Sequence, residues 1–194
     1  FGGGLTDTLN ALAESDFILR YNPYDKKGKT TYYKLIDNFS LFWLKYVESY
    51  QANTNFMTDN MASNIMKSWR GVAFEELCWQ HIRQIKQALG ITGVVSTISA
   101  WGVKGSDETE GAQIDLLIIR NDNVVNLCEM KFVGGAYTID KDEEIKLRNR
   151  IETLKSTLSL KQSVHLTLVT TFGLSYGKHS GIVQKQVELD DLFN

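Results

Sequence analysis

The fold is decided by the stretch from Gln113 to Lys131, which reads Gln-Ile-Asp-Leu-Leu-Ile-Ile-Arg (113–120), Asn-Asp-Asn (121–123) and Val-Val-Asn-Leu-Cys-Glu-Met-Lys (124–131). Two runs rich in Ile, Val and Leu flank three turn-forming residues, a pattern typical of a β-hairpin. If residues 121–123 form a three-residue loop, Asp115 faces Glu129 across the two strands. Side chains that oppose each other on one face have Cβ atoms roughly 4.5–5.5 Å apart.

The length of the loop decides whether these carboxylates meet. Asn123 can take the left-handed backbone that a three-residue loop requires. A two-residue loop would shift the register by one and turn Asp115 to the opposite face from Glu129. With the three-residue loop, Gln113 also faces Lys131.

Asp115 followed by Glu129-Met130-Lys131 resembles the Asp…Glu-x-Lys signature of the PD-(D/E)xK nuclease superfamily. The proline that usually precedes the Asp is replaced here by Ile114, a variation that the superfamily tolerates. The resemblance implies a restriction-endonuclease-like α/β fold, with a mixed sheet flanked by helices. Without it, an Asp–Lys–Glu ion network on a half-buried hairpin explains the same residues equally well.

A long helix is predicted from about residue 63 to residue 89, with Gly90 as its C-terminal stop. Its apolar stripe includes Phe74, Cys78 and Ile85. Glu75 lies at the rim of this stripe and can reach inward, whereas Glu76 points to water. The nuclease resemblance implies that Glu75 joins the metal site; the alternative is a rim carboxylate paired with a lysine.

The implied chemistry is metal-assisted hydrolysis of a phosphodiester. Asp115, Glu129 and the backbone carbonyl of Met130 offer the hard oxygen ligands that Mg²⁺ or Mn²⁺ prefers. Lys131 would orient the attacking water or stabilise the developing charge, with Gln113 in support.

The N-terminal residues 1–55 are predicted to form a separate part from the nuclease-like domain of residues 56–194. A helix over 6–14 and strands over 17–21 and 31–36 match the second half of a winged helix. Lys26, Lys27 and Lys29 would lie at the wing tip and contact DNA phosphates. A solvated loop is the alternative. The aromatic helix 39–49 is expected to belong to the core.

The run Tyr33-Lys34-Leu35-Ile36-Asp37-Asn38-Phe39-Ser40-Leu41-Phe42-Trp43 resembles a family of archaeal-type P-loop ATPases that is also common in Bacteroides-like bacteria. The resemblance continues through residues 69–75, 111–115 and 189–193. It implies that an ATPase domain precedes Phe1 in a longer protein. Gly28-Lys29-Thr30 mimics the end of a phosphate-binding loop, but Pro23 stands where the first glycine is needed, so no nucleotide site is expected here.

Composition fits a globular cytoplasmic protein. Hydrophobic residues make up 43% and charged residues 23%, and no apolar run approaches the ~20 residues that span a bilayer. Cys78 and Cys128 lack metal-site spacing and are expected to be buried thiols. The net charge of −2 does not favour a strong general nucleic-acid binder.

After the hairpin, a helix over 140–159 and a buried strand over 163–171 complete the α/β pattern. The helix carries mixed charge that is expected to face solvent, with Lys141 near its start as a candidate phosphate contact. The expected function is that of a metal-dependent nuclease acting on DNA, or on RNA. The competing interpretation is a non-catalytic DNA-docking or regulatory module of the ATPase.

Overall fold

The computed structural model describes residues 3–24, 30–48, 55–103, 105 and 111–194. The chain divides into two compact units. The first contains Phe1–Tyr21 and Thr31–Gln80, and the second contains Asn22–Thr30 and His81–Asn194. This division differs from the expected boundary near residue 55. The candidate wing-tip residues Lys26, Lys27 and Lys29 lie outside the described residues.

The first unit begins with α1 (Gly3–Glu14), which has no buried residue. Strands β1 (Ile18–Tyr21) and β2 (Tyr32–Leu35) then form an antiparallel pair, and Asp37 caps α2 (Asn38–Phe42) by accepting a hydrogen bond from the Ser40 amide. A π-helical turn (Trp43–Val47), α3 (Phe56–Asn60) and α4 (Asn64–Gln80) complete this unit. The order helix, strand, strand agrees with the sequence, but a winged helix remains a prediction.

The aromatic residues of this unit divide between an internal cluster and the surface. Phe42 and Tyr46 contact Phe56 and Trp69, with ring centroids 5.1–6.2 Å apart. Phe39 and Trp43 are instead exposed, at 72% and 48%. The expectation that all aromatic residues of this helix are core is therefore wrong for these two positions.

Two expectations about the long helix are corrected. His81 leaves the helical conformation, with φ −110° and ψ 29°, so α4 ends at Gln80 and α5 (Ile82–Ala88) is a separate helix. Glu76 is buried rather than turned to water, because Lys34 of β2 packs on that side and forms an ion pair with it at 3.0 Å. Gly90 does end α5, with a positive φ of 70°.

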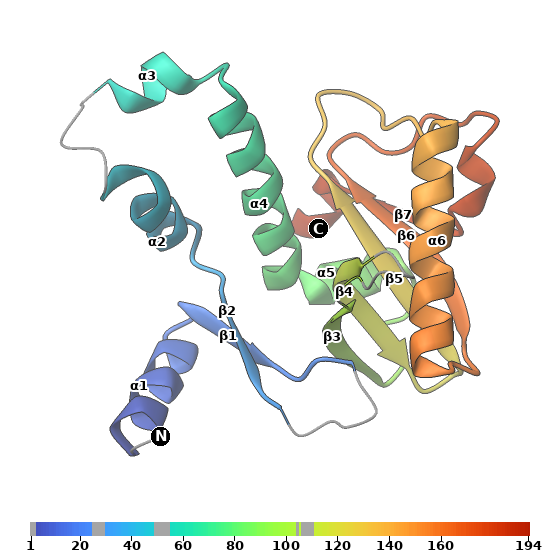
Figure 1. Ribbon diagram of the computed structural model, residues 1–194, viewed down its shortest axis with the longest axis horizontal. Helices are drawn as coiled ribbons and strands as arrows, with labels where there is room; N and C mark the ends of the chain where they lie inside the picture. The colour runs from blue at the N-terminus through green and yellow to red at the C-terminus, as the bar shows by residue number, and fades with distance from the viewer. Residues whose placement is uncertain (1–2, 25–29, 49–54, 104, 106–110) are drawn as a thin grey trace. The chain divides into compact units, whose positions relative to one another are not determined.

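The second unit is built on a five-stranded mixed sheet in the order β3-β4-β5-β6-β7 (Figure 1). The strands are β3 (Ser96–Val103), β4 (Ala112–Arg120), β5 (Val124–Lys131), β6 (Ser163–Thr170) and β7 (Lys185–Glu188). β3, β4 and β5 pair antiparallel, whereas β5, β6 and β7 pair parallel. The mixed α/β architecture expected from the sequence is confirmed.

The hairpin has the predicted loop, and its register is the predicted one over the pairs that form; the expected pairs Asp115–Glu129 and Gln113–Lys131 lie beyond the last of them. β4 ends at Arg120, β5 begins at Val124, and Asn123 has a φ of 70°. Leu116 pairs with Cys128 and Ile119 with Val125. This is the register that an odd-numbered loop produces.

An irregularity interrupts the other edge of β4. Ser99 of β3 pairs with Leu117, but Trp101 pairs with Ile114. Two β4 residues, Asp115 and Leu116, therefore oppose one residue of β3, as in a β-bulge. Ile114 and Leu117 belong to the same hydrophobic core although they are three residues apart, so the alternation of faces resets at Asp115.

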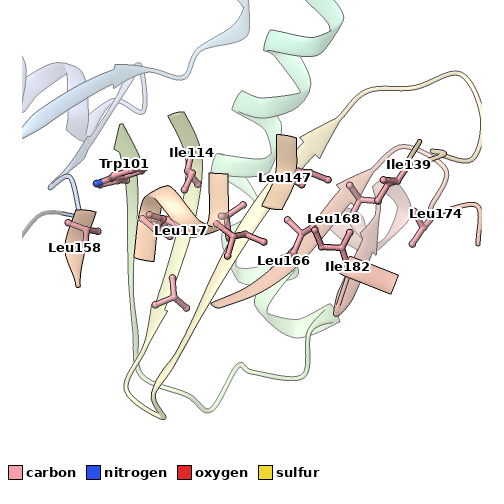
Figure 2. Close-up of a cluster of buried hydrophobic side chains, with 14 residues drawn as sticks. Trp101, Ile114, Leu117, Ile139, Leu147, Leu158, Leu166, Leu168, Leu174 and Ile182 are labelled. Atoms are coloured by element: carbon pink, nitrogen blue, oxygen red, sulfur yellow. The ribbon is translucent and has the colours of Figure 1, made fainter. Parts of the chain in front are cut away.

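The core of this unit lies between the sheet and α6 (Lys141–Leu158). Figure 2 shows this cluster, in which Leu166 and Leu168 of β6 pack with residues of the helix and of the loops that follow the strands. The helix contributes the buried residues Leu147, Ile151, Leu154 and Leu158, which recur at helical spacing. Asp140 caps its start by accepting a hydrogen bond from the Glu143 amide, and Ser159 ends it in a left-handed conformation.

Two 3-10 turns (Ser180–Ile182 and Leu189–Phe193) flank β7. The ring of His81 packs against that of Phe193, with centroids 5.2 Å apart. Cys78 and Cys128 are buried and unbridged, and burial raises the pKa of the Cys128 thiol to about 12. In the described part of the chain, no helix is both long and apolar enough to cross a membrane.

Candidate functional site

The site is centred on Glu129 and Lys131 at the end of β5. Residues two apart on a strand point to one face, and here the Lys131 ammonium lies 2.9 Å from Glu129 Oε1. The Glu129 side chain is 11% exposed and that of Lys131 is 35% exposed. The two charges are thus partly removed from water. Because the dielectric constant is lower there, the attraction between them is stronger than at a fully exposed surface.

Helix α6 supplies two further charged residues to the same face of the sheet. Arg150 Nη1 donates a hydrogen bond to Glu129 Oε2, and Glu143 Oε1 lies 3.7 Å from Lys131 Nζ. Glu143 and Arg150 are seven residues apart and therefore project from the same side of the helix. Leu147 of the apolar stripe lies between them on that side. The result is a row of alternating charge: Arg150, Glu129, Lys131 and Glu143.

Tyr137 extends this row beyond Glu143. Its hydroxyl donates a hydrogen bond of 2.8 Å to Glu143 Oε1. Burial, followed by the hydrogen bond and charge of Glu143, raises the pKa of the Tyr137 hydroxyl well above its ordinary value. Tyr137 therefore remains a neutral donor at physiological pH.

Lys131 is held in its charged form. Burial by itself would lower the pKa of the ammonium, but the charge and hydrogen bond of Glu129, together with the charge of Glu143, outweigh that effect. The pKa of Lys131 is consequently raised above its usual range. Lys131 can donate hydrogen bonds and stabilise negative charge near neutral pH, but it cannot act as a general base there.

Asp115 and Gln113 lie on β4, beside the end of β5. Gln113 Nε2 donates a 2.7 Å hydrogen bond to Asp115 Oδ1. The β4–β5 pairs end at Leu116 and Cys128, so Asp115 and Glu129 each stand one residue past the last pair. Within the described residues, Lys131 is paired with Glu129 and Glu143 rather than with Asp115. Of the Asp–Lys–Glu network expected on the hairpin, the structure therefore shows the Lys131–Glu129 pair, and its further members come from α6 rather than from Asp115.

Glu75 lies on α4, is half-buried, and belongs to the first unit. Asp115, Glu129 and Lys131 all belong to the second unit. Glu75 therefore remains a member of the metal shell only as a prediction from the sequence.

Thr170 of β6 adds a buried hydroxyl to the site. It is in register with Lys131 in the parallel β5–β6 pair, so the two side chains share a face. Thr170 is fully buried, and its Oγ1 has no hydrogen-bond partner among the described residues. A buried polar group without a partner costs free energy, of the order of 1–3 kcal/mol. Such a group beside Lys131 is what a bound water or a ligand oxygen would satisfy.

The donor chemistry of these residues fits a hard divalent cation. Asp115, Glu129 and the Met130 carbonyl would hold it, all of them oxygen donors of the kind that Mg²⁺ and Mn²⁺ select. The Thr170 hydroxyl, which has no hydrogen-bond partner among the described residues, is a further polar group on the same face. Both oxygens of Glu129 already face cationic side chains, so a metal ion would have to compete for this carboxylate.

The surroundings of Lys141 do not favour phosphate binding. Lys141 is exposed at the first position of α6, but Asp140 caps that end and Asp142, Glu143 and Glu144 occupy the first turn. These carboxylates already interact favourably with the positive end of the helix dipole and repel an anion. Lys141 as a phosphate contact remains a prediction without support from its neighbours.

Sequence reasoning missed Glu143, Arg150, Tyr137 and Thr170. It places all the charged residues of α6 in solvent. A signal is nevertheless present, because Glu143 and Arg150 stand one turn before and one turn after Leu147, within the apolar stripe. A charged residue inside such a stripe indicates a buried or half-buried partner.

No family model matches the sequence, and no curated protein matches it. Among solved structures, the chain is similar to the crystal structure of "Protein of Unknown Function AF1548", with a TM-score of 0.40 and 16% sequence identity. That match covers 60% of this chain and 64% of the other, which is less than two thirds of its length.

Proposed function

We propose that the second unit carries a metal-dependent nuclease site of the PD-(D/E)xK type that hydrolyses phosphodiesters in DNA. The observation that carries the proposal is the pairing of Glu129 with Lys131 on one face at the end of a central strand. In the proposal Asp115 joins them from β4, where it stands one residue past the last pair with β5. In the proposal this unit works in the cytoplasm as the C-terminal part of an ATPase, with an ATPase domain earlier in the same chain.

The proposed roles follow from the charge and protonation of each residue. A bound Mg²⁺ or Mn²⁺ would polarise the phosphate and lower the pKa of a coordinated water. Lys131, held as a cation, donates hydrogen bonds toward negative charge that develops on phosphate oxygens. Glu129 fixes Lys131 in position, and Gln113 orients Asp115 through its hydrogen bond.

A bulge at Asp115 supports this assignment. Bulges occur next to active sites, where they redirect a side chain at the end of regular pairing. At Asp115 the regular pairing with β3 is broken and the pairing with β5 has just ended. The carboxylate is therefore not held in the pattern of a regular sheet, which favours a role in binding rather than in sheet stability.

A second candidate function is a non-catalytic DNA-docking or regulatory module of the same ATPase. Arg150 favours it, because its guanidinium neutralises Glu129 from the side opposite Lys131. In that interpretation, the row of alternating charges serves only to fix α6 on the sheet.

Calorimetric titration with Mn²⁺ of the wild-type chain and of Asp115→Ala separates the two candidates. The nuclease proposal expects binding to the wild type and loss of that binding in the variant. Glu152→Ala, which removes an exposed carboxylate from the far side of α6, is the matched control and should bind as the wild type does. Supercoiled plasmid DNA and a structured RNA, incubated with Mn²⁺, then test cleavage. Absence of both metal binding and cleavage would favour the docking module.

A further inference from the structure

Arg150 occupies a position on α6 where the helix otherwise presents apolar side chains. Leu147, Ile151 and Leu154 around it are buried, yet the Arg150 side chain is 29% exposed and turns toward β5. A guanidinium does not lose its proton in proteins, so this residue brings a permanent positive charge to the edge of the core. Its position is explained by Glu129, its ion-pair partner.

Glu129 is shared between two cations. Lys131 contacts Oε1 and Arg150 contacts Oε2, so the carboxylate has a positively charged group on each oxygen. A divalent cation that approached Glu129 would meet strong repulsion from both of them, particularly in a partly buried site. One of the two must withdraw before the metal ion can use this carboxylate.

Arg150 is the cation that can withdraw more easily. Lys131 is held from two sides, by Glu129 on its own strand and by Glu143 on α6. Among the described residues, Arg150 makes its polar contact with Glu129 through Nη1, which leaves four of its five N–H donors without a protein acceptor. A long side chain with one anchor loses little when it turns to water.

We infer that Arg150 is an internal counter-ion of Glu129 that competes with a divalent cation for the same carboxylate. This inference rests on the proposed metal site, and it assigns Arg150 as a positioning residue that sets how tightly that site binds the ion. The Arg150 side chain supplies a positive charge to Glu129, and metal binding replaces that charge with the ion. Metal affinity is then lower than the donor set alone would give.

Mn²⁺ binding to Arg150→Met, measured by calorimetry without nucleic acid, tests the inference. Methionine keeps an unbranched side chain of similar length without the charge, and we expect Mn²⁺ to bind this variant about tenfold more tightly, the effect of one ion pair of ordinary strength. Arg150→Lys keeps the charge and should remain close to the wild type. Arg148→Met is the matched control, since Arg148 is 60% exposed on the same helix and pairs with Glu144 instead.

The outcomes separate this inference from the proposed function. Tighter binding in Arg150→Met that is abolished by adding Glu129→Gln supports the inference, whether or not the wild type binds measurably. Binding in the wild type that is lost in Asp115→Ala but unchanged in Arg150→Met overturns the inference and leaves the metal site standing. Absence of binding in both wild type and Arg150→Met overturns both. Circular dichroism and thermal unfolding of each variant establish that it is folded.

Discussion

Leu116 on β4 pairs directly with Cys128 on β5, and both side chains are buried on the same face of the sheet. This pair fixes the register one step before Asp115 and Glu129. The register depends on the three-residue loop, in which Asn123 takes a left-handed backbone with a φ of 70°. The geometry of one loop residue therefore determines which side chains reach the candidate site.

Asn123→Ala tests this dependence. Asn tolerates the left-handed conformation because its short polar side chain can bond locally, whereas alanine does not, so we expect a loss of about 1 kcal/mol in the free energy of unfolding. Asn123→Gly should match or exceed the wild type, since glycine adopts a positive φ freely. Urea unfolding gives the free energy of unfolding of the wild type, Asn123→Ala and Asn123→Gly. Asn121→Ala, an exposed loop position with no positive φ, is the control and should change stability by less than about 0.5 kcal/mol.

Two features restrict position 173 to glycine: a positive φ and the close approach of the Glu188 side chain. Its φ is 74°, and a Cβ at this position would collide with Oε1 of Glu188. Gly173→Ala should lower the free energy of unfolding by about 1–3 kcal/mol, because the residue would be strained and the Glu188 side chain displaced. Gly181→Ala is the comparison, since a Cβ there would meet no atom within 4 Å and its φ is not positive. Equal losses in the two variants would contradict the assignment of strain to Gly173.

Glu144 predicts a pH dependence of stability. Its pKa is lowered by the hydrogen bond from His179 and then by that from Arg148. Because the folded-state pKa lies below the ordinary value of 4.5, the unfolded chain binds more protons in this range. The stabilisation is present above pH 4.5 and is lost as the pH falls through the folded-state pKa.

Glu144→Gln should therefore flatten the loss of stability below pH 4.5, measured by urea unfolding at a series of pH values. Glu152→Gln removes one negative charge from the same helix without touching His179 or Arg148 and controls for net charge. A slope that is the same in wild type and Glu144→Gln would show that the interactions of Glu144 with His179 and Arg148 do not contribute to stability in solution.

The sequence was sufficient for the hairpin because two local signals agree there. Two apolar runs mark the strands, and Asn123, which can take a left-handed backbone, marks a three-residue loop between them. The bulge at Asp115 could not be foreseen, because it arises from the register between β3 and β4, and the long segment 104–111 that joins these strands does not set a register as a short turn does. The break at His81 was also hidden, since the apolar stripe of α4 and α5 continues through it at helical spacing.

In the candidate site, too, the contacts within one strand could be predicted from the sequence, whereas those between the helix and the sheet could not. Glu129 and Lys131 share a face because of strand geometry, which two residues of sequence already specify. Their partners Glu143 and Arg150 depend on how α6 lies across β5, which spacing within the helix does not define. The charged positions in the apolar stripe of α6 indicated that partners existed, but not which residues they were.

The hydrogen bond from Tyr137 to Glu143 gives a test of this network that does not depend on catalysis. Burial raises the pKa of the Tyr137 hydroxyl, and the hydrogen bond and charge of Glu143 raise it further. Glu143→Gln removes the charge but keeps an acceptor of similar shape, so the pKa of Tyr137 should fall toward its ordinary value of 10 while remaining above it. Alkaline titration of tyrosinate absorbance, with the signal of Tyr137→Phe subtracted in each background, isolates this residue.

Lys131 should respond in the same direction. The charge of Glu143 contributes to the raised pKa of Lys131, so Glu143→Gln should also lower the pKa of that ammonium, measured by NMR of isotope-enriched lysine side chains. Asp142→Gln, one residue earlier on the exposed side of α6, is the control for net charge and should leave both groups as they are in the wild type. If Glu143→Gln lowered the pKa of Tyr137 but not that of Lys131, Glu143 would interact with Tyr137 and not with Lys131. Helix α6 would then contribute to the candidate site through Arg150 alone.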